Sequence, residues 1–279
     1  MKSNMARTTL KNTAPKPVPK TISVAFSGSG FLAPIHAGAA CAFLDSGYTF
    51  KSVSGTSGGS IVAGAIATGM TQKELRELAI KADFSKVLRI SPWSILTGKA
   101  YCNGDALLNF LASTMRFKSF SDLNLPCKII ATDLEYGVPY VFSKETTPST
   151  QVGLACRASS AVPYIYESVQ YGGKVLVDGG VVNNIPIAFL DKGPRVGIAV
   201  NTSGKNSLGG PIQTASALIS ILLSANEGTQ ELLAQHEGAG LVTVDPGNAW
   251  FLDTNMSSME RFALFTKGYQ GVKNWLATQ

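Results

Sequence analysis

The sequence Gly55-Thr56-Ser57-Gly58-Gly59 constrains this 279-residue chain more than any other stretch. A strand-like run, residues 50–54, precedes it, and a helix-like run of small apolar residues, 61–67, follows it. A Gly-x-Ser-x-Gly sequence between a strand and a helix is typical of a nucleophile elbow, in which a strained turn presents the serine hydroxyl. The helix N-terminus behind the serine favours negative charge that develops there. The alternative is a tight glycine turn with a buried capping serine.

A serine nucleophile needs a base, and the sequence offers three candidates. His36 lies in an Ala/Gly-rich helical stretch and is interpreted as a packing or hydrogen-bonding residue. His236 lies on what reads as an exposed helix face, although the order Ser, Asp, His would fit a conventional triad. Asp178 is favoured, because an apolar strand ends at this acid and two glycines then turn the backbone beside its carboxylate. A simple Asp-Gly hairpin is the alternative for Asp178.

A glycine loop near the start of the chain supplies a third feature. The strand-like residues 22–26 lead into Gly28-Ser29-Gly30, and a helix is expected from about residue 34 to 44. Successive backbone N–H groups in such a loop form an anion site. A phosphate-binding loop is the competing interpretation, but the Walker ending and the third glycine of a dinucleotide loop are missing. An oxyanion hole fits better, with the N–H groups of Gly28, Ser29, Gly30 and Gly58 as donors.

Together these motifs resemble those of the patatin-like phospholipase family, in the family's order, over residues 22 to about 187. The matching stretches, besides the three above, are His36 with Gly38, Ala131-Thr132-Asp133-Leu134 with Gly137, Arg157-Ala158-Ser159-Ser160-Ala161-Val162-Pro163 and Val181-Val182-Asn183-Asn184-Ile185-Pro186. The family's glycine loop usually continues with a small residue, Arg or Lys, and Gly, where this chain has Phe31, Leu32 and Ala33. The missing cation removes one contact to an anionic head group.

The resemblance implies a lipid acyl hydrolase of the phospholipase A or lysophospholipase type that uses a Ser–Asp dyad and needs no cofactor or metal. Ser57 would be the nucleophile, and Asp178 the base and then the acid. A carboxylate is a weaker base than imidazole, but a short charge-assisted hydrogen bond lets it take the serine proton during attack. The alternatives are acyl transfer or neutral-lipid ester hydrolysis at the same site, and a catalytically silent lipid-binding protein.

The order of apolar runs predicts the fold class. Strand-like segments alternate with helical ones, which favours a three-layer α/β/α domain with a mostly parallel central sheet, as in patatin-like proteins. The expected strands are residues 22–26, 52–54, 128–132, 140–143, 175–178, 195–200 and 241–244. Active sites in such sheets lie beyond the carboxyl ends of the strands, where the glycine loop, Ser57 and Asp178 all fall. We expect one domain over residues 21–279.

Residues 1–20 differ from the rest. They contain five of the chain's 24 basic residues, three prolines and no acid, which predicts a disordered, extended tail. The remaining 19 basic and 18 acidic residues nearly balance, so nucleic-acid binding is not expected. The tail is interpreted as a solvated arm or as a segment attracted to an anionic membrane.

The expected location is cytoplasmic or peripheral to a membrane. The tail lacks the apolar core of a signal peptide, and the longest apolar stretch, residues 215–225, is too short to span a bilayer and is expected to be a packed helix. The four cysteines lack metal-site spacing and are expected to be reduced and buried. The expected partners are lipid substrate and, transiently, a membrane surface; the sequence fixes no oligomeric state.

Three further features of the sequence have more than one interpretation or a structural role. Asp133 follows a predicted strand and is expected to cap the next turn. Arg157 is interpreted as the partner of a structural ion pair or of an acidic substrate group. The apolar run around Trp93, between a helix capped by Thr71 and Glu74 and another starting after Cys102, is either loop core or a lid that contacts acyl chains or a bilayer.

Overall fold

The computed structural model describes residues 20–201 and 238–279, together with isolated residues between 214 and 236. The first strand begins at Lys20, so the expected tail lies outside the described residues except for this residue. The expected packed helix at residues 215–225 also falls largely outside them.

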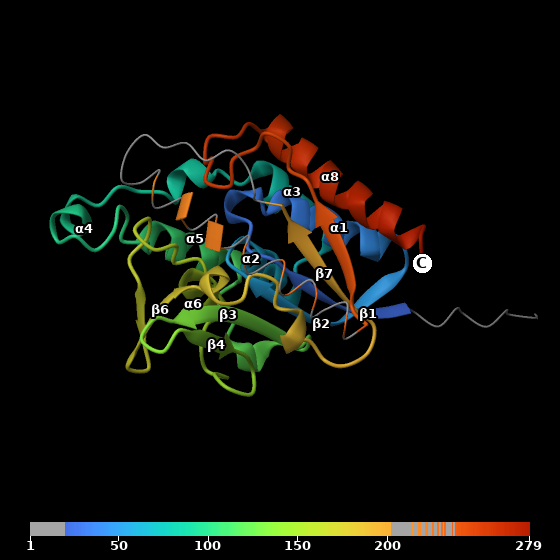
Figure 1. Cartoon of the computed structure of the whole chain (residues 1–279), viewed down its shortest axis with the longest axis horizontal. Helices are drawn as coiled ribbons and strands as arrows, with labels where there is room; N and C mark the ends of the chain where they lie inside the picture. The colour runs from blue at the N-terminus through green and yellow to red at the C-terminus, as the bar shows by residue number, and fades with distance from the viewer. Residues whose placement is uncertain are drawn as a thin grey trace, which may run out of the picture.

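The described part of the chain contains one eight-stranded mixed sheet, in the order β5-β6-β3-β2-β1-β7-β8, with β4 also paired to β3 (Figure 1). Pairing is parallel from β3 through β2, β1 and β7 to β8, and antiparallel where β4, β6 and β5 join. All seven predicted strands are present, and β5 was not predicted. The strand bounds are β1 Lys20–Phe26, β2 Tyr48–Thr56, β3 Cys127–Asp133, β4 Val138–Phe142, β5 Val169–Tyr171, β6 Lys174–Asp178, β7 Arg195–Val200 and β8 Gly240–Val244.

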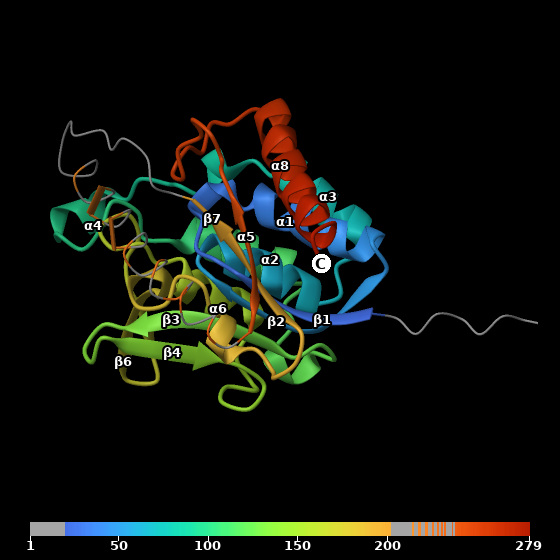
Figure 2. The same cartoon turned by 45° about the vertical axis from the view of Figure 1, so that its right-hand side comes forward.

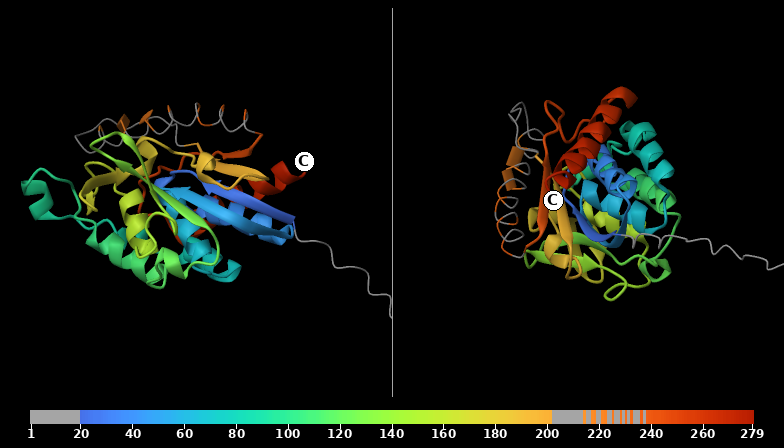
Figure 3. Two further views of the ribbon diagram at one scale, coloured as in Figure 1. Left: turned by 90° about the horizontal axis from the view of Figure 1, so that it is seen from below. Right: turned by 90° about the vertical axis from the view of Figure 1, so that its right-hand side faces the viewer.

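Most of the described helices cover one face of the sheet, and isolated helical residues between 214 and 236 lie on the other, which agrees with the predicted three-layer fold (Figures 2 and 3). The α-helices are α1 Pro34–Asp45, α2 Gly58–Ala67, α3 Gln72–Lys81, α4 Pro92–Leu96, α5 Asp105–Thr114, α6 Val152–Ser159 and α8 Ser258–Leu276. The start of α1 at Pro34, the Thr71–Glu74 capping box of α3 and the start of α5 after Cys102 were predicted. No prediction covered α6 or α8.

Alternate residues of the inner strands divide the core into two parts. On one face, Phe26 and Ile198 join the large core under the helices α1, α2 and α8. On the other, Ala25 and Ala199 pack against residues 185–190, and a helical residue described beyond them, Ala217, is also buried.

One edge of β3 is shared by two strands, and this places the ends of β2 and β6 next to each other. Thr56 at the end of β2 pairs with Ile130, and Asp178 at the end of β6 pairs with the next residue of β3, Ala131. The opposite edge of β3 is occupied by β4, whose Tyr140 also pairs with Ala131. The residue after Thr56 is therefore brought close to Asp178 by strand register alone.

The helices α1 and α8 come into backbone contact through two glycines. A Cβ atom added to Gly38 would overlap the carbonyl oxygen of Phe265, and one added to Gly268 would overlap the carbonyl oxygen of Ile35. Because the glycines let the two backbones touch, α8 fixes the position of α1 and of the glycine loop that precedes it.

Replacing Gly268 with alanine should therefore lower the free energy of unfolding by about 2 kcal/mol, because backbone atoms of α1 cannot move aside cheaply. Urea unfolding followed by circular dichroism measures this change. Gly271→Ala is the matched control in the same helix: its added Cβ would lie 3.1 Å from a Val244 methyl, so its effect should stay within about 1 kcal/mol. Equal effects of the two substitutions would contradict the close-contact explanation.

Candidate active site

Ser57 occupies the sharp turn between β2 and α2. Its backbone has φ 48° and ψ −124°, a conformation that a residue with a side chain rarely adopts and that costs about 1–3 kcal/mol. The turn is held by a hydrogen bond of 2.9 Å from the Ser57 N–H to the Ser159 hydroxyl at the end of α6. Ser159 in turn donates to the carbonyl of Ile130 in β3. The strain at the serine is thus supported by a neighbouring helix and strand.

The Ser57 hydroxyl donates a hydrogen bond of 2.6 Å to Oδ2 of Asp178. The other carboxylate oxygen, Oδ1, accepts the N–H of Gly180 at 2.8 Å, and the Asp178 backbone is fixed by bonds to Ala161 and Thr132. Both Ser57 and Asp178 are at least 95% buried. The two residues predicted as the dyad therefore lie within hydrogen-bond distance, on the elements that the sequence indicated.

Burial changes the acidity of this carboxyl. Removal from water raises the pKa of Asp178 from 3.8 to about 6, and the hydrogen bonds from Ser57 and Gly180 oppose part of the rise. A carboxylate with this pKa is a stronger proton acceptor than an exposed one and is still ionised at neutral pH.

The glycine loop lies against the start of α2. A Cβ atom on Gly58 would overlap the Gly30 carbonyl oxygen and lie 2.6 Å from the Ser29 hydroxyl, so the elbow and the loop touch through backbone. The Gly58 N–H belongs to the first turn of α2, where backbone donors have no acceptor within the helix. The N–H of Gly28, in contrast, already donates to the Asn184 carbonyl at 3.0 Å.

The two histidines do not contact the Ser57–Asp178 pair. His36 is fully buried, and its Nε2 lies 2.9 Å from the carbonyl of Ser27 while its ring packs edge-on against Phe26. Burial lowers the pKa of His36 to about 3, so its imidazole is neutral. This confirms the interpretation of His36 as a packing residue that holds the strand end before the glycine loop. His236 is exposed.

The two other assigned polar residues have structural contacts. Asp133 accepts the N–H of Glu135 in the turn after β3, as predicted, and also pairs with Lys174. The predicted ion pair of Arg157 is wrong for the described residues: its buried guanidinium donates instead to the carbonyls of Asn103, Gly104 and Glu167, and lies over the Tyr166 ring. Arg157 thereby fixes the loop that follows α6.

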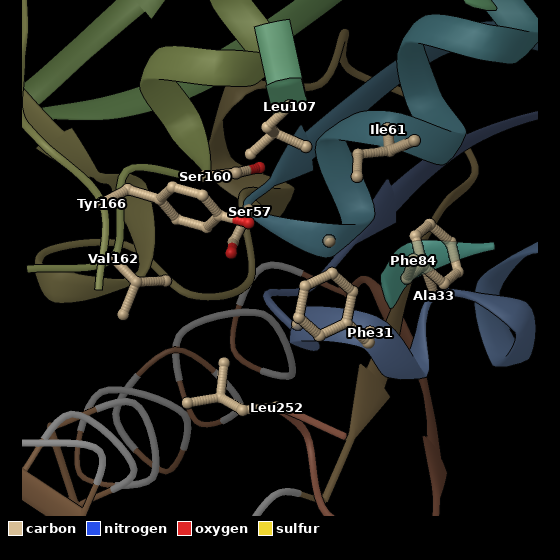
Figure 4. A pocket seen from close by; sticks show the side chains of 12 residues that line it. Phe31, Ala33, Ser57, Ile61, Phe84, Leu107, Ser160, Val162, Tyr166 and Leu252 are labelled. Atoms are coloured by element: carbon tan, nitrogen blue, oxygen red, sulfur yellow. The ribbon is translucent and has the colours of Figure 1, made fainter. Parts of the chain in front are cut away.

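A pocket of about 420 Å³, including the space open to solvent, surrounds Ser57 (Figure 4). We call it the Ser57 pocket. Its wall is made of Gly30, Phe31, Ala33, Ser57, Gly58, Ile61, Phe84, Leu107, Ser160, Val162, Tyr166 and Leu252. Apolar side chains dominate this wall, and the buried Ser160 hydroxyl has no hydrogen-bond partner among the described residues. The pocket therefore fits a largely apolar ligand that carries one polar group beside Ser57.

Some residues of the site were not assigned a role from the sequence. Ser159 and Ser160 belong to a motif that the family shares, but the bond of Ser159 to the elbow joins residues 102 positions apart. Leu252 comes from the chain after β8 and completes the wall, while the carbonyl of the adjacent Phe251 accepts the Phe31 N–H at 2.8 Å. No local pattern marks these late residues.

Comparison with known proteins agrees with the fold. A family model described as Patatin-like phospholipase matches residues 24–191, more than half of the chain. YqhO, an uncharacterized protein of Bacillus subtilis, is 26% identical over 274 residues, which cover 87% of this chain and 94% of YqhO. The probable lipid hydrolase 463L of Invertebrate iridescent virus 6 is 25% identical over 153 residues, about half of each protein.

Among solved structures, VipD from Legionella pneumophila has a similar fold, with a TM-score of 0.63 at 16% identity. The match covers 94% of this chain and 67% of the VipD chain. The likeness to VipD concerns the fold alone, whereas the family match supports a lipid ester hydrolase in general. The chain belongs to the patatin-like phospholipase family.

The buried carboxylate should destabilise the folded protein above its pKa. A pKa raised from 3.8 to about 6 means that the folded state binds this proton more tightly than the unfolded chain does. Protonated Asp178 therefore contributes its full stabilisation of the folded state below pH 3.8, and this contribution is lost as the pH rises through 6. Relative to the wild type, the free energy of unfolding of Asp178→Asn should therefore increase by up to about 3 kcal/mol as the pH rises from 4 to 8. Denaturant unfolding of both proteins across this range measures the difference.

The comparison is made between two proteins that share every other titrating group, including His36, so those contributions cancel. A stability difference that stays constant from pH 4 to pH 8 would show that Asp178 does not have a raised pKa.

Proposed function

We propose that this protein cleaves acyl esters of lipids through a Ser57–Asp178 dyad, as a phospholipase A or lysophospholipase. The observation that carries the proposal is the 2.6 Å hydrogen bond from the Ser57 hydroxyl to a buried carboxylate, at the wall of an apolar pocket. Family membership supports the substrate class. The name of the viral relative, a probable lipid hydrolase, points to the same chemistry.

In the first half of the reaction, the Ser57 Oγ attacks the ester carbonyl carbon while its proton passes to Oδ2 of Asp178. The tetrahedral intermediate then collapses: the bond to the leaving alcohol breaks, and the protonated Asp178 gives its proton to the departing alkoxide. In the second half, Asp178 takes a proton from water as the water oxygen attacks the acyl-enzyme. The second tetrahedral intermediate then collapses: the bond between the acyl carbon and Ser57 Oγ breaks, Asp178 returns its proton to Oγ, and the fatty acid is released. An alkoxide is a better leaving group than an amide nitrogen. Ester cleavage therefore makes a smaller demand on the catalytic acid and base, and a carboxylate, which is a weaker base than imidazole, is sufficient for it.

Backbone N–H groups would stabilise the negative charge of the intermediate. Gly30 and Gly58 are the best placed, because both line the pocket beside Ser57 and the α2 N-terminus adds its dipole. The Ser29 N–H is a further candidate next to them, whereas we leave Gly28 out because its N–H is bonded to Asn184. One such donor is typically worth about 3–4 kcal/mol in the transition state.

We further propose that the segment around α4 contacts the lipid surface. Among the described residues, no helix has the length and apolar character needed to cross a membrane. Trp93 and Leu96, however, are 68% and 78% exposed on a segment that projects from the body (Figure 1), which contradicts the alternative of packed loop core. The exposed Arg89 and Lys99 flank them, and an apolar tip between cations suits anionic phospholipid head groups.

The same segment is connected to the pocket. The Ser94 hydroxyl donates to Glu167, and the Tyr166 hydroxyl, whose ring lines the pocket, donates to the Val87 carbonyl. A lipid surface that receives Trp93 would therefore lie close to the pocket wall.

A fluorophosphonate probe tests the dyad, because it reacts with an activated serine. The wild type should be labelled, Ser57→Ala should lose labelling, and Asp178→Asn should label far more slowly because the base is missing. Ser113→Ala, which removes an exposed serine of α5, should label like the wild type. Strong labelling of Ser57→Ala would overturn the assignment, and a folded wild type that resists the probe would favour a silent lipid-binding protein.

Replacing Trp93 with alanine should lower the hydrolysis of anionic phospholipid vesicles about tenfold, because an exposed indole that inserts into lipid buries a large apolar area. Hydrolysis of a dissolved short-chain ester should change less than about twofold. Phe117→Ala is the control, since Phe117 is 65% exposed beside the far end of α2, where Lys118 bonds Thr68. Equal losses of Trp93→Ala on both substrates would contradict surface contact.

A further inference from the structure

A second apolar cavity adjoins the Ser57 pocket. It has about 270 Å³ of space, including the part open to solvent, between α1, α2 and α3, and we call it the α3 cavity. The side chains that line this cavity alone are Pro34, Ala37, Val62, Leu75, Leu78 and Ala79. None of them carries a polar side-chain atom, so the cavity offers nothing to a head group, an ion or a sugar and fits only hydrocarbon.

The two cavities are separated by a thin wall. Ala33, Ile61 and Phe84 line both of them, which makes these three residues the shared boundary. Ala33 has only a methyl group, so the Phe84 ring is the largest part of the wall. Figure 4 shows Phe84 beside Ala33, on the side of the pocket where Phe31 and Ile61 lie.

Phe84 is held by other rings rather than by the sheet. It is carried by the short 3₁₀ turn Phe84–Lys86, between α3 and α4, and is 5% exposed. Its ring centroid lies 5.3 Å from that of Phe31 and 6.0 Å from that of Phe110. Of these neighbours, Phe31 lines the Ser57 pocket, and Phe110 lines neither cavity.

We infer that Phe84 forms the floor of the acyl-chain site, and that the α3 cavity binds the distal methylenes of longer chains once this ring moves or is removed. The inference rests on the proposed acyl-ester hydrolysis at Ser57. An acyl chain whose carbonyl is held at Ser57 and Gly58 must run into the apolar part of the pocket, and Ile61 and Phe84 lie along that wall. Phe84 is thus a specificity-determining residue for chain length.

The size of the effect follows from methylene burial. Each additional methylene that enters an apolar site improves binding about fourfold, whereas a methylene that stays in water contributes nothing. The wild type should therefore gain kcat/KM with chain length only until the chain reaches Phe84. Opening the wall should let the gain continue into the α3 cavity.

The test measures kcat/KM for 4-nitrophenyl esters from butanoate to dodecanoate, each below its aggregation limit. Phe84→Ala should raise the ratio of dodecanoate to butanoate at least tenfold over the wild type, and Phe84→Leu should raise it less. Phe110→Ala removes a ring of the same size that touches Phe84 but lines neither cavity, and should keep the wild-type ratio. Adding Ala79→Phe to Phe84→Ala refills the α3 cavity and should restore the wild-type ratio.

Thermal unfolding and fluorophosphonate labelling of every variant separate a folding defect from a change in specificity, and Phe84→Leu serves if Phe84→Ala does not fold. A folded, labelled Phe84→Ala or Phe84→Leu with the wild-type chain-length profile would overturn this inference alone. A folded wild type that hydrolyses no ester and resists the probe would overturn the proposed function, and this inference with it.

Discussion

The site depends on the register of a single strand. Because β2 and β6 divide one edge of β3 between them, Thr56 and Asp178 pair with the consecutive residues Ile130 and Ala131. The 2.6 Å bond from Ser57 to Asp178 follows from this arrangement. Successive side chains of a strand point to opposite faces, so a slip of one residue in β6 would turn the carboxylate away from the serine. The register is fixed at this point by the Asp178 N–H, which donates to the Ala161 carbonyl, and by the Thr132 hydroxyl, which donates to the Asp178 carbonyl.

The strained serine and the buried carboxylate of the site both lower the stability of the folded protein. Ser57 is held in a strained turn, and burial raises the pKa of Asp178 to about 6, so both residues weaken the folded state at neutral pH. The surrounding structure offsets this cost through tight backbone packing, as where Gly268 lets α8 touch α1. A carboxylate that is poorly hydrated in this way becomes a base strong enough to assist a serine, which an exposed aspartate is not.

The sequence predicted the parts of the site that are local. The elbow, the glycine loop and the acid before Gly179-Gly180 each combine a strand end with a turn, and short-range rules cover such combinations. Other parts of the site depend on contacts between distant segments, so no short pattern contains them. These are the bond from Ser57 to Ser159, the place of Leu252 in the pocket wall, and the place of Phe84 between the two cavities. Trp93 was undecided for another reason: an apolar run reads the same whether it faces a core or a lipid, and only its exposure distinguishes the two.

Because Leu252 lies late in the sequence, the ribosome completes the Ser57 pocket only after it has made the dyad. A ribosome that has just added Asp178 has completed every residue proposed for the chemistry, but it has not yet made the chain that supplies Leu252 and the Phe251 carbonyl to the pocket. The helix α8, which fixes α1, comes later still. Ser57 and Asp178 are therefore synthesised before the residues that complete the pocket around them. A nascent chain that already contains both residues still lacks a complete pocket in which to bind and cleave a cellular lipid.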